Sequence, residues 1–203
     1  MPPLTPAENR IFRSLSNPKK IQDFLNTLGK RVTDDESYLR SPRNVLRAGT
    51  ANCLEGALLA AAALIYHGHK AYLLDLKVDV RNENDVDHVV AVFKKNGCFG
   101  ALSQTRHAVL RYREPVYKTL RELALSYFHE YFTDDGKKTL RTYSKLFDIQ
   151  KEFGTDWIIS GDSLSDIAVR LDDSPHKAYL TKEMARDLRL ADPIEIAAGK
   201  IVE

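Results

Sequence analysis

Cys53 and His88 are the two residues of this sequence that could together carry out nucleophilic chemistry. Cys53 begins the stretch CLEGALLAAAALIYHG, in which apolar residues recur at the spacing of an amphipathic helix. At a helix N-terminus, unpaired N–H groups and the helix dipole stabilise a thiolate, which is the nucleophilic form of cysteine. His88 begins HVVAVFKK, a β-branched run typical of a strand. An imidazole beside a thiol favours a thiolate–imidazolium pair and supplies a general base.

Each of these two residues also has a simpler interpretation. Most free cysteines are small buried hydrophobic residues, and a single histidine on a strand is more often only hydrogen-bonded. The second cysteine, Cys98, lies in the predicted strand CFGAL and is expected to have no redox role. The chemical interpretation therefore requires the helix to pack on the sheet so that Cys53 and His88 come into contact.

Capping and alternation predict the elements that would bring the two residues together. Asn52 fits an N-cap, and Glu55 can reach back to it as in a capping box. Gly68 fits the position after the helix. Strict alternation predicts a strand in AYLLDLKVDV, and the NG turn between HVVAVFKK and CFGAL predicts a hairpin. The expected fold class is therefore α+β, with the helix headed by Cys53 packed on a small antiparallel sheet and extra helices at both ends.

The chain divides into three predicted regions. Residues 1–17 are polar and contain several prolines, and they are expected to form a loose N-terminal arm. Residues 18–150 form the predicted core, with a first helix in NPKKIQDFLNTLG and a helix of about five turns in EPVYKTLRELALSYFHEYF. Residues 151–203 are expected to be a C-terminal extension packed on this core, with two short helices and a final strand in PIEIAAGKIV.

Composition limits the functional classes. A length of 203 residues fits one domain, and 30 basic against 28 acidic side chains leave a net charge of +2. This charge gives no electrostatic case for nucleic acid or a membrane as a partner. Two cysteines do not make a disulfide framework, and the N-terminal segment lacks the features of a secretory signal. We therefore expect a cytoplasmic protein with reduced thiols.

The order of these parts resembles the core of the transglutaminase-like superfamily, whose members share a papain-like α+β fold. Three segments carry the resemblance and make up less than a quarter of the chain: NCLEGALLAAAALIYHGHKAYLLDL, DVDHVVAVF and NGCFGALS. In that family a cysteine begins a helix, a glycine follows the helix before the next strand, and the histidine begins a strand of apolar residues. The resemblance implies a catalytic triad in which Cys53 and His88 are the first two members.

The third member of the implied triad departs from the family. The family pattern is a tryptophan followed four residues later by an aspartate, whereas here Phe99 is followed by Ser103. A serine can accept a hydrogen bond from the imidazole and hold its tautomer, but it cannot supply the negative charge that stabilises an imidazolium. The amide of Gln104 could take this role instead, although strand alternation directs it to the opposite face. His107 is a further alternative without a motif behind it.

The implied activity is acyl chemistry on an amide or thioester-like bond of a peptide or protein substrate, without a cofactor and without a metal. Cys53 would attack the carbonyl, and His88 would take and return the proton. The Cys53 N–H would hold the oxyanion, with Asn52 as a candidate second donor. Asp87 directly precedes His88 and could tune its pKa. Hydrolysis and transfer to an amine are both open.

The competing interpretation is a catalytically inactive binding module on the same fold. Its basis is Ser103, because a serine stands where the family has an acid. This interpretation predicts a Cys53 thiol with an ordinary or raised pKa and slow alkylation at neutral pH. The enzyme interpretation predicts fast alkylation of Cys53 relative to Cys98, with a pH profile that depends on His88.

Overall fold

The computed structural model describes residues 1–31, 38–79 and 87–201, and it has an α+β fold. Its centre is a six-stranded antiparallel sheet with the strand order β6-β5-β4-β3-β7-β8. The strands of this sheet are β3 (Tyr72–Val78), β4 (His88–Lys95), β5 (Cys98–Leu102), β6 (Arg113–Tyr117), β7 (Leu140–Ser144) and β8 (His176–Ala178). A separate parallel pair joins β1 (Gly29–Lys30) to β2 (Thr50–Ala51).

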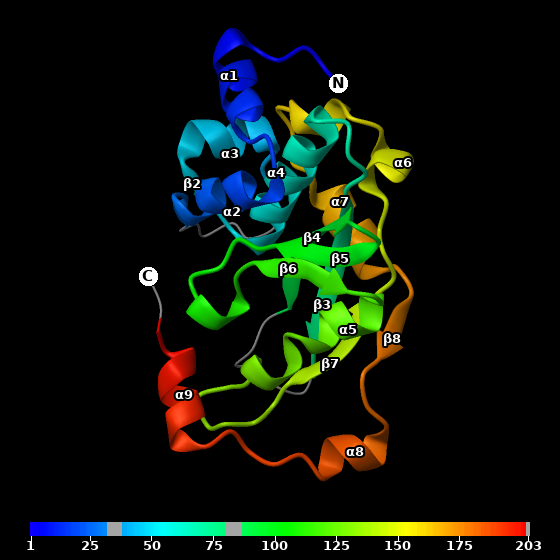
Figure 1. The fold of residues 1–203 in the computed structure, drawn as a ribbon. Helices are drawn as coiled ribbons and strands as arrows, with labels where there is room; N and C mark the ends of the chain where they lie inside the picture. The colour runs from blue at the N-terminus through cyan, green and yellow to red at the C-terminus, as the bar shows by residue number, and fades with distance from the viewer. Residues whose placement is uncertain (32–37, 80–86, 202–203) are drawn as a thin grey trace.

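Helices cover both faces of the sheet (Figure 1). One face carries α4 (Cys53–Tyr66), together with α1 (Pro6–Ser14), α2 (Pro18–Asn26), α3 (Pro42–Ala48) and α7 (Ser165–Asp172). The other face is covered by α5 (Leu120–Leu125) and the 3-10 turn Phe128–Glu130. The remaining helical segments of the described chain are α6 (Ile149–Phe153), α8 (Lys182–Arg186), α9 (Pro193–Gly199) and the 3-10 turns Ala108–Leu110 and Asp156–Ile158. None of the helices in these described ranges is long and apolar enough to cross a membrane.

Alternation along the strands separates two hydrophobic cores. Leu73, Val89 and Ala91 pack on the side of α4, whereas Leu74 and Val90 pack on the side of α5. The predicted packing of the helix headed by Cys53 on an antiparallel sheet is therefore confirmed. Strands β6, β7 and β8 extend the sheet beyond the three strands that alternation predicted.

The helix headed by Cys53 begins and ends as predicted. The Asn52 side chain accepts a hydrogen bond from the Glu55 N–H (2.8 Å), and the Glu55 carboxylate accepts one from the Asn52 N–H (3.1 Å). Residues 57–64 are almost completely buried, so the stability of this part of the helix depends on packing on every side. Gly68 follows the helix with a φ of 76°, a left-handed conformation that favours glycine.

The predicted hairpin between β4 and β5 is also confirmed. Asn96 and Gly97 have φ angles of 52° and 79°, and positive angles at both positions are what a two-residue type I′ turn requires. Strand β5 is the shorter arm, because its last residue, Leu102, pairs with Ala91. The first residues of β4, including His88, therefore extend past the end of β5.

The N-terminal residues 1–17 are not a loose arm, and this prediction is wrong. Thr5 caps α1 in a complete capping box with Glu8, and Pro6 occupies the first turn. Phe12 is 1% exposed and belongs to the core around α4. The sequence TPAE carries the signal for this cap, a threonine followed by proline and, three residues later, glutamate.

Two predicted elements in the second half of the chain are also wrong. The segment predicted as one long helix instead forms β6, α5 and a 3-10 turn, because its first part pairs with β5 and a capping box of Thr119 and Glu122 starts the helix only afterwards. Pro115 is tolerated because β6 is an edge strand. The predicted final strand is the helix α9, which Asp192 caps and Pro193 begins.

The C-terminal residues 151–203 contribute to the central structure as well as packing on it. Strand β8 pairs with β7 and forms one edge of the sheet. Ile167 and Leu171 of α7 reach the core around α4. This region therefore completes the sheet and one hydrophobic core.

Gly56 allows α4 to lie close to the residues after β5. A Cβ at position 56 would lie 2.1 Å from the Gln104 Cβ, a contact that real structures do not tolerate. Gly56→Ala is therefore expected to lower the free energy of unfolding by about 1–3 kcal/mol, although alanine is the better helix former by about 1 kcal/mol. Urea denaturation measures the change. Gly161→Ala is the matched control because nothing lies within 4 Å of a Cβ there, and equal stability of the two variants would contradict the close approach.

Candidate active site

Cys53 lies at the start of α4, beside the start of β4. The backbone N–H groups of Val89, of Leu54 and of Cys53 itself lie around the Cys53 sulfur and favour its thiolate form. Asp75 is the residue of β3 opposite Val89, and its N–H donates to Ser144 Oγ on β7 (2.9 Å). Asp75 and Val89 are therefore a pair without hydrogen bonds between their backbones. For this reason the Val89 N–H points away from β3, toward the side of β5. Because β5 has already ended, the thiol takes the place of a strand neighbour.

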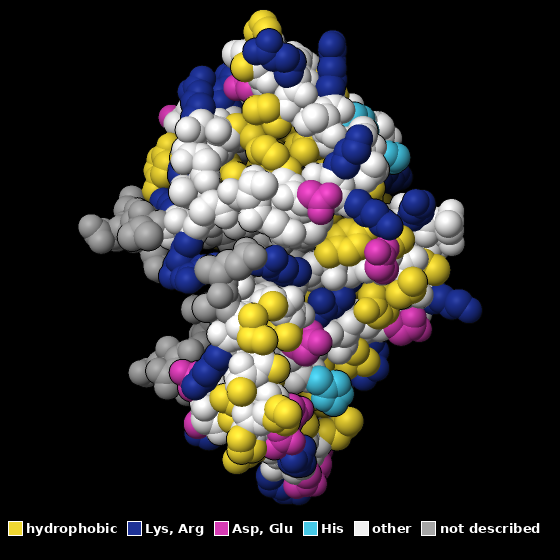
Figure 2. All heavy atoms as spheres, turned by 60° about the vertical axis from the view of Figure 1, so that its left-hand side comes forward, with side chains coloured by type: hydrophobic (Ala, Val, Ile, Leu, Met, Phe, Trp, Pro, Cys, Tyr) yellow, Lys and Arg dark blue, Asp and Glu magenta, His cyan; other side chains and the backbone are white. Residues whose placement is uncertain are grey.

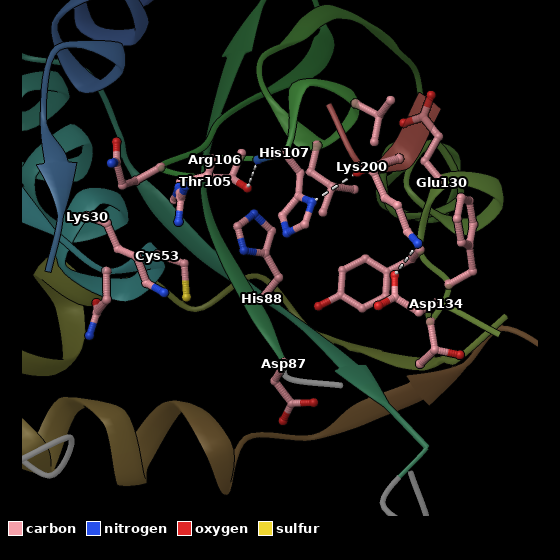
Figure 3. A pocket seen from close by; sticks show the side chains of 18 of the residues that line it. Lys30, Cys53, Asp87, His88, Thr105, Arg106, His107, Glu130, Asp134 and Lys200 are labelled. Carbon is pink, nitrogen blue, oxygen red and sulfur yellow. Dashed lines mark hydrogen bonds and ion pairs between the residues drawn. The ribbon is translucent and has the colours of Figure 1, made fainter. Parts of the chain in front are cut away.

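His88 reaches the same place from the other face of the sheet. Alternation puts it on the side of Val90, opposite α4, at the open end of β4. In Figure 3 the side chains of Cys53 and His88 lie near one another at one end of a pocket that both residues line. The structure thus brings these two candidate residues into one pocket.

The pocket has a volume of about 750 Å³ and a mixed lining. Besides Cys53 and His88, basic, acidic and apolar side chains line it, including Lys30, Arg31, Arg106, His107, Lys200, Asp87, Glu130, Asp134, Val109, Leu110, Tyr131, Phe132 and Ile196. One wall comes from the end of the chain: His107 Nδ1 lies 3.3 Å from the Gly199 carbonyl oxygen, and the Ala108 N–H donates to the Ile201 carbonyl (3.2 Å). The volume is in the range of pockets that enclose small ligands.

The His88 ring is held by a hydrogen bond between its Nε2 and the Ser103 hydroxyl, 2.7 Å long. Both residues are almost completely buried, with exposed fractions of 6% for His88 and 1% for Ser103. Because this bond occupies Nε2, Nδ1 is the ring nitrogen left to accept a proton from a thiol. For Nδ1 to accept a proton, Nε2 must carry the ring hydrogen and donate it to Ser103 Oγ.

Ser103 is held in turn by Gln22 of α2, a residue that the sequence analysis missed. The Ser103 N–H donates to Gln22 Oε1 (2.9 Å), and Gln22 Nε2 donates to the Ser103 carbonyl oxygen (2.8 Å). In the sequence, Gln22 stands beside Ile21 and Leu25, the apolar positions of the predicted helix, and this is the signal that its polar side chain is buried. The site therefore includes a helix that precedes Cys53 in the chain.

The N-terminus of α4 is fixed by the Glu55 carboxylate, which has no exposed surface. Arg31 Nη1 donates to Glu55 Oε1 (2.7 Å), and Arg40 donates from its backbone N–H, Nε and Nη2 (3.0, 2.9 and 2.8 Å). Burial raises the pKa of Glu55, but the hydrogen bonds from Arg40 and Asn52 outweigh it, so the pKa lies below its ordinary value. Glu55 is therefore ionised at neutral pH. The two arginine partners were not predictable from local sequence.

Burial makes the resting pair electrically neutral. It lowers the pKa of His88 to about 4, with smaller contributions from His107 and Arg113. Burial also raises the pKa of the Cys53 thiol, although N–H groups around the sulfur oppose the rise and the charge of Asp75 adds to it. At pH 7 the pair is therefore a thiol and a neutral imidazole. The expected thiolate–imidazolium pair is not the resting state.

Asn52 and Asp87, two candidates for accessory roles, make different contacts. Asn52 uses its amide oxygen for the helix cap, and its amide nitrogen has no hydrogen bond to any part of the chain that the structure describes. Asp87 accepts a hydrogen bond from the Val78 N–H (2.9 Å). The expectation that Asp87 tunes the pKa of His88 is wrong, because burial and the charges of other residues cause that shift.

Gln104 lies on the α4 side of the sheet, as strand alternation predicted. Its side chain packs against Gly56, and its Nε2 lies 3.4 Å from the Leu28 carbonyl oxygen. Ser103, which points the opposite way, is the residue that bonds to His88. Gln104 lines the pocket and does not orient the imidazole.

A cluster of charged residues on β3 and its neighbours was also missed. Asp75 is 4% exposed, and its Oδ2 lies 3.2 Å from His176 Nε2. Burial and the charge of Asp87 raise the pKa of Asp75 to about 6, while His176 opposes the rise. Within the described ranges, Asp75, Asp87 and Asp172 form the group whose ligand atoms are close enough to hold a metal ion, all within 4.8 Å. Lys77 pairs with Asp172 (2.5 Å), so the cluster already includes a cation.

No family model matches the sequence of this chain, and no curated protein matches it. The functional interpretation therefore rests on the geometry of the site.

The low pKa of His88 predicts a specific loss of stability in acid. The pKa of the ring is about 4 in the folded protein against 6.5 ordinarily, so the unfolded chain binds more protons between these values and folding weakens as the pH falls through them. The difference between the two pKa values corresponds to roughly 3 kcal/mol of unfolding free energy. We expect wild-type protein to lose about that much more unfolding free energy than His88→Gln between pH 7 and pH 4, as measured by urea denaturation. Equal losses in both proteins would show that His88 titrates normally.

The charge of Asp75 is expected to slow the reaction of Cys53 with electrophiles. Asp75→Asn removes a negative charge that raises the pKa of the thiol, so alkylation of Cys53 by iodoacetamide at pH 8 should become severalfold faster. Mass spectrometry measures the rate, with Cys98 as the reference in the same molecule. Asp172→Asn is the control because Asp172 belongs to the same cluster but has its charge paired with Lys77. Equal acceleration in both variants would contradict the assignment.

Proposed function

We propose that this protein performs cysteine-dependent acyl chemistry, hydrolysis or acyl transfer, with Cys53 as the nucleophile and His88 as the general base. The observation that supports this best is that Cys53 and His88 line the same end of one pocket, with His88 Nε2 bonded to Ser103. We also infer that α4, β3, β4 and β5 form a transglutaminase-like core of the papain-like type. Its support is the order of these elements and the positions of the cysteine and the histidine at the starts of α4 and β4.

The reaction would proceed through an acyl-enzyme. The Cys53 proton moves to His88 Nδ1 as the sulfur attacks the substrate carbonyl carbon, forming an S–C bond and a tetrahedral oxyanion. Collapse of this intermediate breaks the C–N bond of an amide, and the amine leaves with the proton from Nδ1. Water or a second amine then attacks the thioester and gives its proton to His88. Release of the acyl group returns that proton to the sulfur.

Donors for the oxyanion are available at the start of α4. The first N–H groups of a helix have no partner within the helix, and those of Cys53 and Leu54 are close enough to the sulfur to favour its thiolate form. Asn52 lines the same pocket with an amide nitrogen that is not hydrogen-bonded within the described ranges. We assign the Cys53 N–H and the Asn52 amide as the two donors. One such donor contributes a factor of roughly 10²–10³ to the rate in known enzymes.

The neutral resting pair and the serine at the third position predict a slow reaction. Ser103 can hold the tautomer of His88, but it has no charge to stabilise the imidazolium that forms during attack. Loss of the orienting acid costs about 10⁴ in rate in a serine protease. Cysteine depends less on such help because it is more acidic and more nucleophilic than serine. Proton transfer is therefore expected to accompany attack on a bound substrate rather than to precede it.

The lining of the pocket favours a peptide or protein segment as the substrate. In Figure 3, Lys30 and Arg106 lie near Cys53, whereas Glu130 and Asp134 lie at the other end. The face that carries α9 has basic side chains across its middle and hydrophobic side chains on its lower part (Figure 2). A peptide can contact charged and apolar groups of this kind along its length.

The second candidate function is a binding module without catalysis. Two observations favour it: burial raises the pKa of the Cys53 thiol and lowers the pKa of His88, and Ser103 supplies no charge. In that case the pocket would bind its peptide without forming a covalent bond. The two candidates differ in whether Cys53 becomes acylated.

Reaction with p-nitrophenyl acetate separates the two candidates. For the enzyme, we expect a stoichiometric burst of p-nitrophenol and an acetyl group on Cys53, identified by peptide mass spectrometry. His88→Gln should slow the burst by about 100-fold or more, the usual contribution of a general base, whereas Cys98→Ser should leave it unchanged. Absence of the Cys53 adduct, or an equal burst in His88→Gln, would contradict the enzyme and support the binding module.

A further inference from the structure

We propose that Gln22 is a positioning residue for His88, acting through the backbone of Ser103. The proposal rests on the proposed function of Cys53 and His88, and it adds a residue that makes no contact with the thiol or the imidazole. Gln22 belongs to α2 and lies 81 positions before Ser103 in the sequence. Its role is therefore set entirely by the tertiary structure.

The contacts of Gln22 show that it takes the place of a missing strand partner. By the alternation of the ladder, the N–H and carbonyl of Ser103 face away from β4 toward the side of β6, whose pairing with β5 does not extend past Ala101. Gln22 supplies one acceptor and one donor to these two groups, at 2.9 and 2.8 Å. A buried backbone group needs such partners, and Gln22 is itself 5% exposed.

The orientation of the Gln22 amide follows from its partners. The Ser103 N–H can only donate, so Oε1 must face it, and the Ser103 carbonyl can only accept, so Nε2 must face that group. Nε2 also donates to Asn26 Oδ1 (2.9 Å). Three hydrogen bonds therefore hold the amide in one orientation.

The chemical consequence is control of the His88 tautomer. With its backbone held at both ends, Ser103 keeps its hydroxyl 2.7 Å from His88 Nε2. There the hydroxyl oxygen can accept the Nε2 hydrogen, and in that tautomer the Nδ1 lone pair is left to accept the Cys53 proton. Without Gln22, the Ser103 backbone loses both partners, the hydroxyl can move away, and the ring can take the other tautomer, in which Nδ1 has no free lone pair.

Gln22→Met tests the role because it keeps the volume of the side chain and removes both hydrogen bonds to Ser103. Long-range ¹H–¹⁵N spectra of histidine-labelled protein report the tautomer of His88, whose signals are identified by their loss in His88→Gln. We expect the Nε2–H tautomer to dominate in the wild-type protein and a mixture of tautomers in Gln22→Met. In the p-nitrophenyl acetate assay, kcat should fall by about tenfold or more while KM stays within about twofold.

Two further variants separate positioning from stability. Ile21→Val alters the adjacent core position of α2 without touching Ser103, so it should lower the unfolding midpoint but leave the tautomer and kcat unchanged. Gln22→Glu keeps an acceptor for the Ser103 N–H and loses the donor to its carbonyl, so it should give an intermediate tautomer ratio and kcat. If Gln22→Met does not fold, Gln22→Glu decides the question alone.

An unchanged His88 tautomer in the folded Gln22 variants, or an equal loss of kcat in Ile21→Val, would overturn the proposal. The tautomer spectra do not depend on turnover. A wild-type protein that shows no acylation would therefore remove the proposed function, while the same spectra would still decide whether Gln22 sets the state of His88.

Discussion

The position of the Cys53 thiol depends on one buried carboxylate. Glu55 has no exposed surface, and it accepts hydrogen bonds from the Asn52 N–H and from the side chains of Arg31 and Arg40. An ionised group out of contact with water is tolerated only when its charge and its lone pairs are both satisfied, and removal of one partner from such a pair costs about 3–5 kcal/mol. The interaction joins the end of β1 and the segment before α3 to the first turn of α4. It therefore fixes where the helix begins, and with it the sulfur.

The second constraint is the length of β5. The Cys53 thiol comes from the helix on one face of the sheet and the His88 side chain lies on the other face, and both reach the same pocket because β5 ends before it reaches the first residues of β4. The gap opens the Val89 N–H to the sulfur, and Gln22 holds the backbone of Ser103. The Cys53–His88 pair is uncharged at rest. In the proposed reaction, negative charge develops on the substrate oxygen only when the sulfur attacks the carbonyl carbon. The hydrogen-bond donors at the start of α4 would stabilise that charge, so they matter more to the proposed chemistry than a preformed thiolate.

The sequence predicts correctly those features of the fold that depend on residues close together in the chain. The cap and the end of α4, the alternation of β3 and the turn between β4 and β5 each depend on a few adjacent residues, and all were found. Elements that need a distant partner were not: β6 forms because β5 lies beside it, and α1 is stable because Phe12 enters the core. At the site, the start of a helix and the start of a strand were enough to select Cys53 and His88, whereas Ser103 was selected by the family resemblance. Gln22 and the neutral state of the pair were missed because both depend on burial and on contacts far apart in the chain.

The central claim is that the Cys53 sulfur is a nucleophile with His88 Nδ1 as its proton acceptor. A crystal structure of the protein after reaction with a short peptide aldehyde tests it most directly, because an aldehyde forms a thiohemiacetal with a nucleophilic cysteine. The account predicts a covalent bond from Cys53 Sγ to the aldehyde carbon, the new hydroxyl oxygen at the start of α4, and His88 Nδ1 within hydrogen-bonding distance of the adduct while Nε2 stays on Ser103. An unmodified Cys53 in a pocket that holds the peptide, or an adduct from which His88 is turned away, would contradict it.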